Sequence, residues 1–78
     1  MEGISLRNVR YLIQDEFQAN QVADDLKVQL DINRMETISI TSVESRNEVI
    51  VQIPEANESV EEVLSGFMRG YQKGMILE

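Results

Sequence analysis

The stretch TISITSVESRNEVIVQIP, residues 37–54, decides the fold, because two β-branched runs in it are separated by a short polar segment. Thr37–Val43 and Glu48–Ile53 both alternate apolar with polar residues, and this period of two is typical of half-buried strands. Ser45–Asn47 separates the two runs, and Asn is one of the few residues that tolerate the positive φ of a tight turn. The sequence therefore predicts a β-hairpin.

Two residues refine the hairpin prediction, one at the end of its second strand and one inside that strand. Pro54 lacks the N–H that a strand ladder needs, so it is expected to end the second strand. Ile50 breaks the alternation. It either packs on the second face of the sheet or at its edge, or offers an apolar contact to a partner.

A helix is predicted downstream of the hairpin. Ser59 and Glu62 have the spacing of a capping box, in which each side chain binds an otherwise unpaired backbone N–H. The apolar stripe that follows has helical spacing and comprises Val60, Val63, Leu64, Phe67 and Tyr71. Glycines recur every fourth residue along its flank, at Gly66, Gly70 and Gly74. They indicate a close backbone approach to the sheet, the end of the helix, or a dimer face.

Upstream of the hairpin, the pattern predicts one helix and one further strand. The helical stripe consists of Leu6, Val9, Leu12, Ile13 and Phe17. Ser5 is its expected N-cap, and Asn20 is expected to end it in a left-handed conformation. Val28, Leu30 and Ile32 then alternate with polar residues and predict a strand beginning at Lys27. Residues 22–26 fit either a helical turn or a loop.

These elements predict an α+β fold of order αβββα. The three strands would form an antiparallel meander, and the N- and C-terminal helices would pack on one face of it. At 78 residues, the chain is expected to be one small domain spanning residues 1–78.

Composition excludes several chemistries. The chain has no cysteine and no histidine, so it cannot form disulfides, thiolate or imidazole metal sites, or Ser-His and Cys-His nucleophilic centres. No apolar run approaches the roughly 20 residues of a membrane span, and Met1–Leu12 lacks the apolar core of a signal peptide. We therefore expect a cytoplasmic protein without a membrane partner.

Acidic residues dominate, with 14 Asp and Glu against 7 Lys and Arg and a net charge of -7. Nine of the 14 fall into two patches, Asp15, Glu16, Asp24, Asp25 and Asp31 in the first, and Glu55, Glu58, Glu61 and Glu62 in the second. Carboxylates in the first turn of a helix also stabilise its positive end, which is the alternative explanation of the second patch. This balance disfavours direct binding of nucleic acid and favours a basic protein surface as the partner.

No cofactor, metal or catalytic site is predicted. Asp31–Asn33 begins like a calcium loop but lacks the glycine and the terminal glutamate at the required offsets. The glycines do not have the spacing of a phosphate-binding loop, and four aromatic residues in so short a chain offer little to hold a substrate. The sequence therefore favours a non-enzymatic binding protein.

Met75–Leu77 forms a short apolar tail after the last glycine. It is expected to pack as a hook against the core or to serve as a binding edge. The alternative to a binding protein is a small self-associating assembly module, a homodimer held together by the glycine flank, by Ile50 or by this tail.

One family resemblance accompanies this interpretation. Residues 57–71, NESVEEVLSGFMRGY, together with the preceding strand that starts at Asn47-Glu48, resemble the end of small acidic prophage proteins. The Listeria prophage anti-CRISPR inhibitors of type II RNA-guided nucleases are among the proteins that this stretch resembles.

The resemblance implies an inhibitor that mimics DNA. Its acidic surface would occupy the groove in which the nuclease reads its target-adjacent motif with arginines, and its hairpin would reach the nuclease active site. By position, the hairpin residues are Arg46, Asn47 and Glu48. Where the relatives continue into an acidic segment, this chain has Lys73–Glu78, so mimicry would use the two acidic patches.

Overall fold

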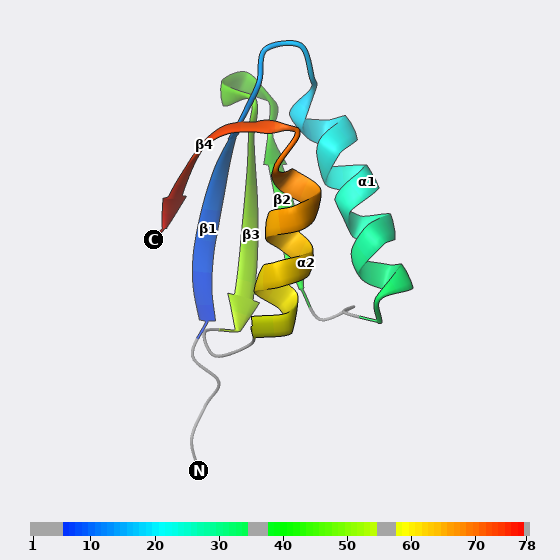
Figure 1. The fold of residues 1–78 in the computed structure, drawn as a ribbon. Helices are drawn as coiled ribbons and strands as arrows, with labels where there is room; N and C mark the ends of the chain where they lie inside the picture. Colours follow the sequence, from blue (N-terminus) through cyan, green and yellow to red (C-terminus); the bar gives the residue numbers. More distant parts are fainter. Residues whose placement is uncertain (1–5, 35–37, 55–57, 78) are drawn as a thin grey trace.

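The computed structural model describes residues 6–34, 38–54 and 58–77, which form one antiparallel sheet covered on one face by two helices (Figure 1). In chain order the elements are β1 (Leu6–Ile13), α1 (Ala19–Ile32), β2 (Ser39–Val43), the 3-10 turn η1 (Glu44–Arg46), β3 (Glu48–Pro54), α2 (Glu58–Met68) and β4 (Gln72–Leu77). The predicted α+β class is confirmed, but the predicted order αβββα is wrong, because the chain begins with a strand and its first helix is Ala19–Ile32. The predicted three-stranded meander is wrong, because the sheet has four strands.

The strand order is β2-β3-β1-β4, with every neighbouring pair antiparallel. Two βαβ units, β1-α1-β2 and β3-α2-β4, therefore interlock, and each contributes one central strand and one edge strand. This connectivity is the split βαβ, or ferredoxin-like, arrangement. The helices α1 and α2, here called the helix layer, lie on one face of the sheet, and no other described element covers the opposite face.

The predicted N-terminal helix is wrong, because Leu6–Ile13 forms the central strand β1. Val9, Tyr11 and Ile13 alternate, and all three are buried against the helix layer. Leu12 points to the other face of the sheet. Because it follows Val9 by three residues, the segment also fits the spacing of a helix, and this led to the wrong prediction. Pairing with both β3 and β4 selects the strand. Ser5, the predicted N-cap, lies outside the described residues.

The strand predicted from Lys27 is also wrong, because these residues are the second half of α1. The buried side of α1 has helical spacing and comprises Ala19, Val22, Ala23, Leu26 and Leu30. Val28 and Ile32, which suggested the alternation, are exposed on the outer side of the helix. Residues 22–26 are helical, and Asn20 lies in the first turn of the helix instead of ending one.

The hairpin prediction is confirmed. β2 and β3 pair from Ser39 opposite Gln52 to Val43 opposite Glu48. Asn47 has the predicted positive φ, at 53°. Ile50 lies on the helix-free face, half-buried and paired with Arg10, in one of the placements that the sequence predicted. The second strand ends at Pro54.

The stripe predicted for the second helix is confirmed in α2. Val60, Leu64 and Met68 are buried, while Val63 and Phe67 pack at the edge of the core. Tyr71, the last residue of the predicted stripe, also packs against the core but lies in the turn after the helix. Helix α2 begins at Glu58, so Ser59 lies inside its first turn.

Of the three glycines, Gly70 lies just after the end of α2, and neither Gly66 nor Gly70 makes a close approach to the sheet. A Cβ added at Gly66 or Gly70 would meet no atom within 4 Å, so close packing there is excluded. The helix ends at Met68, Gly70 lies in the following turn, and Gly74 lies in β4, where an added Cβ would be 3.4 Å from Leu12 Cδ1.

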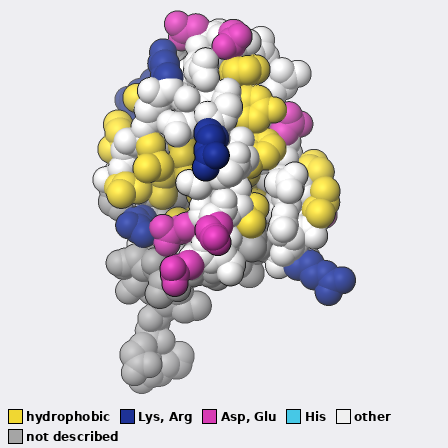
Figure 2. All heavy atoms as spheres, viewed as in Figure 1, with side chains coloured by type: hydrophobic (Ala, Val, Ile, Leu, Met, Phe, Trp, Pro, Cys, Tyr) yellow, Lys and Arg dark blue, Asp and Glu magenta, His cyan; other side chains and the backbone are white. Residues whose placement is uncertain are grey.

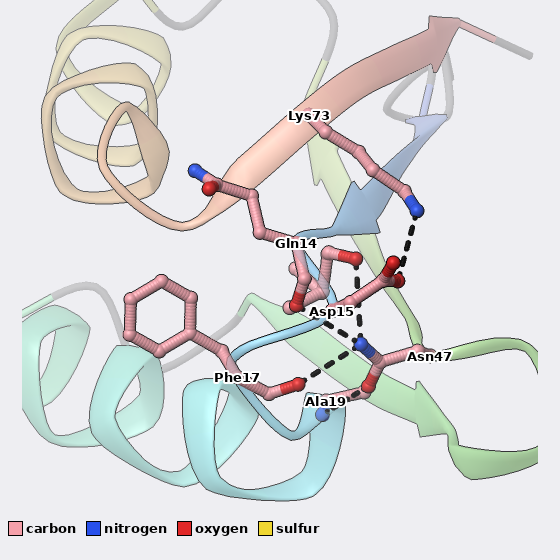
Figure 3. A network of polar contacts seen from close by, with 7 residues as sticks. Gln14, Asp15, Phe17, Ala19, Asn47 and Lys73 are labelled. Carbon is pink, nitrogen blue, oxygen red and sulfur yellow. Dashed lines mark hydrogen bonds and ion pairs between the residues drawn. The ribbon is translucent and has the colours of Figure 1, made fainter.

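Asn47 joins the hairpin to the segment between β1 and α1 (Figure 3). Its Oδ1 accepts a 2.8 Å hydrogen bond from the Ala19 N–H, at the start of α1. Its Nδ2 donates to three carbonyl oxygens, those of Ile13 and Gln14 at 3.3 Å and that of Phe17 at 2.9 Å. Gln18, at the N-cap position of α1, forms no side-chain cap, so Asn47 supplies it from 28 residues away.

The same segment is tied to the turn before β4. The Gln14 N–H donates to the Tyr71 carbonyl at 2.9 Å, and Gln14 Nε2 donates to the Gly70 carbonyl at 3.2 Å. The Phe17 and Tyr71 rings meet edge to face, with centroids 4.9 Å apart. Three loops are thereby fixed together at one end of the sheet.

Replacing Asn47 tests whether these bonds stabilise the fold. Asn47→Gly retains the freedom for positive φ but removes the side-chain bonds, and it should lower the free energy of unfolding by about 2 kcal/mol in urea titrations. Asn47→Ala should cost about 1 kcal/mol more, because a Cβ disfavours the left-handed conformation.

The matched control is Arg34→Gly, at the other non-glycine position of positive φ among the described residues, where φ is 60°. It should leave stability unchanged or raise it slightly, since glycine relieves the left-handed backbone. A stability of Asn47→Gly equal to that of the wild type would show that the hydrogen bonds contribute nothing.

Candidate protein-binding surface

The fold segregates charge between its two layers. Within the helix layer, α1 and α2 carry six carboxylates and one basic residue, Lys27, for a net charge of -5. The four strands carry three basic residues and one carboxylate, Glu48, for a net charge of +2. An acidic composition has thus become an acidic face backed by a weakly basic sheet.

Most of the helix-layer carboxylates point to solvent. The exposed ones are Asp24, Asp25 and Asp31 on α1, and Glu58 and Glu62 on α2, which together we call the acidic helix surface. Glu61 is half-buried, and its Oε1 lies 3.6 Å from the Arg7 guanidinium. In Figure 2, which views the helix layer from the front, acidic side chains gather over the first turns of α2. A shallow groove runs along this side of α2 from Glu58 to Arg69.

The other predicted acidic residues are distributed differently. Asp15 and Glu16 lie in the segment between β1 and α1, at the end of the sheet opposite the start of α2, so the two predicted patches do not form one continuous surface (Figure 1). Asp15 is exposed and forms a 3.1 Å ion pair with Lys73 of β4 (Figure 3). Glu55 lies outside the described residues.

The three hairpin residues have different environments. Arg46 is exposed in η1 and free to meet a partner. The Asn47 side chain is hydrogen-bonded to backbone groups of its own chain, from Ile13 to Ala19. Glu48 is buried, and its Oε1 forms a 2.9 Å ion pair with Arg10 on the helix-free face of the sheet. The resemblance implied that all three reach a partner, whereas the fold leaves only Arg46 of these three available.

A small cavity of about 120 Å³ opens between α2 and the strands β1 and β4. Its walls are mainly apolar, and its polar lining comes from Arg7, Tyr11, Glu61 and Ser65. Tyr11 is 3% exposed, and burial raises the pKa of its hydroxyl to about 12, with the Glu61 carboxylate as a second cause. The Tyr11 hydroxyl therefore keeps its proton, and with it its capacity to donate a hydrogen bond, beyond pH 10.

Sequence reasoning did not single out Tyr11 or Arg7, because both were assigned to a helix. The alternation of Val9, Tyr11 and Ile13 was the available signal that they belong to a strand.

Met75–Leu77 forms the second half of β4. The predicted hook buried against the core is wrong, because the segment pairs with β1 as a strand and all three side chains remain exposed.

Neither a metal centre nor a membrane span is found among residues 6–34, 38–54 and 58–77. No three acidic side chains there gather closely enough to hold an ion. Asp31 is exposed at the end of α1, and the Asn33 amide donates to the Gln29 carbonyl at 2.8 Å. No helix in these ranges is long and apolar enough to cross a bilayer.

Comparison with protein-family models, curated proteins and solved structures found no match. Because one topology supports many unrelated functions, the function must be inferred from the surfaces themselves.

The raised pKa of Tyr11 predicts alkaline instability. A tyrosine that ionises near pH 10 when unfolded and near pH 12 when folded stabilises the fold fully below pH 10, and this contribution is lost as the pH rises to about 12. Tyr71→Phe leaves Tyr11 as the sole tyrosine, so absorbance at 295 nm should show one transition with a midpoint near pH 12.

The companion variant Tyr11→Phe should lose less stability than the wild type between pH 10 and 12. A midpoint near pH 10 in the Tyr71→Phe protein would mean that solvent reaches the Tyr11 hydroxyl freely.

Proposed function

We propose that this protein is a non-enzymatic inhibitor that binds a nucleic-acid-handling protein through the acidic helix surface. The carboxylates of α1 and α2 would occupy a basic groove that otherwise holds nucleic acid, and they would steer association electrostatically. A phage-derived protein acting in the cytoplasm on a type II RNA-guided nuclease is the form of this proposal that the family resemblance favours.

The distribution of acidic residues along α1 is the observation that supports the proposal most strongly. Carboxylates stabilise a helix in its first turn and destabilise it in its last turn. The first turn of α1 contains no acidic residue, whereas Asp31 lies in its last turn, where no basic residue compensates it. Helix stability explains Glu58 and Glu61 at the start of α2 but not the carboxylates of α1. Binding to a basic partner gives these residues a role.

Side-chain packing also supports the proposal. Asp24 and Asp31 are separated by two helical turns, so they project from the same outer side of α1. The core positions of α1 and α2 face the sheet, which directs the outer sides of both helices away from it. The sheet fixes this acidic surface in place, so that little ordering entropy is lost on binding.

The hairpin plays a smaller part in this proposal than the resemblance implies. Asn47 and Glu48 are held by hydrogen bonds and an ion pair within the chain, so Arg46 is the hairpin contact that remains. We therefore assign inhibition to occupation of a groove, with Arg46 at its margin.

A pair of charge-matched variants tests the proposal in a DNA-cleavage assay with a guide-loaded type II nuclease. Asp24→Asn with Glu62→Gln neutralises two carboxylates of the acidic helix surface. Glu16→Gln with Glu44→Gln neutralises two exposed carboxylates outside it and leaves the same net charge. Wild-type protein should inhibit cleavage more weakly as salt rises.

The helix variant should need about tenfold more protein for half-inhibition at low salt, and the control should stay within about twofold of the wild type. Equal weakening of both variants would mean that net charge, and not this surface, matters. Absence of inhibition by the wild type at any salt concentration would contradict the proposed target.

A further inference from the structure

Strand β4 is an edge strand with an unusual composition. It pairs with β1 on one side, and among the described residues no strand pairs with its other side. An edge of this kind presents a row of unpaired N–H and C=O groups to any strand that approaches it. Proteins commonly protect such edges with proline or with charge, and β4 has no proline and a single charged residue, Lys73.

Both faces of β4 are apolar at its free end. Met75 and Leu77 lie opposite Tyr11 and Val9 on the helix-layer face, and Ile76 lies opposite Arg10 on the other face. Their exposed fractions are 49%, 57% and 45%, respectively. A group of hydrophobic side chains is visible over the β4 side of the molecule in Figure 2. The strand thus combines free backbone groups with apolar side chains.

The opposite edge of the sheet is different. β2 exposes Ser39 and Thr41, and α1 packs against its inner face. The two edges therefore differ in polarity and in cover, and β4 is the edge suited to an apolar partner strand.

Charge distribution indicates which partner suits it. Each basic residue of β1 and β4 is neutralised within the chain, because Arg7 pairs with Glu61, Arg10 with Glu48 and Lys73 with Asp15. The exposed carboxylates lie mainly on the helix layer. A second copy of a chain with charge -7 would meet repulsion at the acidic helix surface and less repulsion at this neutralised edge.

We propose that β4 pairs antiparallel with β4 of a second copy, so that two sheets join into one continuous eight-stranded sheet. Two identical strands related by a two-fold axis are complementary to each other without any further adaptation. A pairing centred on Ile76 places Met75 of each copy beside Leu77 of the other. Both helix layers then lie on the same side of the joined sheet, which doubles the acidic helix surface.

Sedimentation of the full chain tests the pairing. The wild type should form dimers at tens of micromolar protein, and Ile76→Lys should be a folded monomer, as judged by circular dichroism. Val28→Lys, which places the same charge at another exposed apolar position, should remain dimeric. Dimerisation should strengthen as salt rises, because screening weakens the repulsion between two acidic copies.

Cysteine cross-linking locates the contact even if Ile76→Lys fails to fold. The natural chain has no cysteine, so Ile76→Cys introduces one thiol, and mild oxidation should give disulfide-linked dimers. Cross-linking should be at least about tenfold faster than in the controls Val28→Cys and Ser39→Cys, because strand pairing holds the two thiols together. A monomeric wild type at high micromolar concentration, a dimer that survives in folded Ile76→Lys, or faster linkage through Ser39→Cys would each overturn the proposal.

Discussion

The side chain of Asn47 holds together the parts of the molecule that the chain order separates. One amide binds the end of β1, the segment that follows it and the first N–H of α1, while its own backbone adopts the left-handed conformation that closes the hairpin. Asparagine suits this position, since it tolerates positive φ and also carries both a donor and an acceptor. The start of α1 is thereby fixed relative to β3, and with it the direction of the acidic residues along that helix.

Charge segregation follows from this arrangement. The strands use their basic residues in ion pairs with carboxylates from elsewhere in the chain, which leaves the sheet nearly neutral toward solvent. The helix layer retains its carboxylates on the outer side. Binding of a basic partner and pairing of two copies would then use different surfaces, and they would respond to salt in opposite directions.

Local signals made the hairpin and α2 predictable from the sequence. Asn47 immediately precedes β3 and Pro54 ends it. The apolar stripe of α2 fits the helical spacing alone. The segment from Leu6 to Ile32 was misassigned because its residues fit two periods at once. The alternation around Tyr11 competes with a helical period, and pairing with β3 and β4 decides for the strand. Burial in the folded chain shows that Ala19 and Ala23, rather than Val28 and Ile32, face the core.

The binding surface was predictable in composition but not in arrangement. The acidic residues of α1 were identified although their secondary structure was predicted wrongly, because the charge of a segment does not depend on whether it forms a helix or a strand. The roles of Asn47 and Glu48 could not be predicted, since their partners lie about 30 to 40 residues away in the sequence. The pairing of β4 with β1 is likewise a contact between the two ends of the chain.

The most direct test of the acidic helix surface is nuclear magnetic resonance of the labelled protein during titration with a guide-loaded type II nuclease. The largest changes in backbone amide signals should fall on the outer residues of α1 and α2, between Asp24 and Asp31 and between Glu58 and Glu62. They should diminish as salt is added. Changes confined to the hairpin or to the helix-free face of the sheet, or no changes at low salt, would contradict the assignment of this surface.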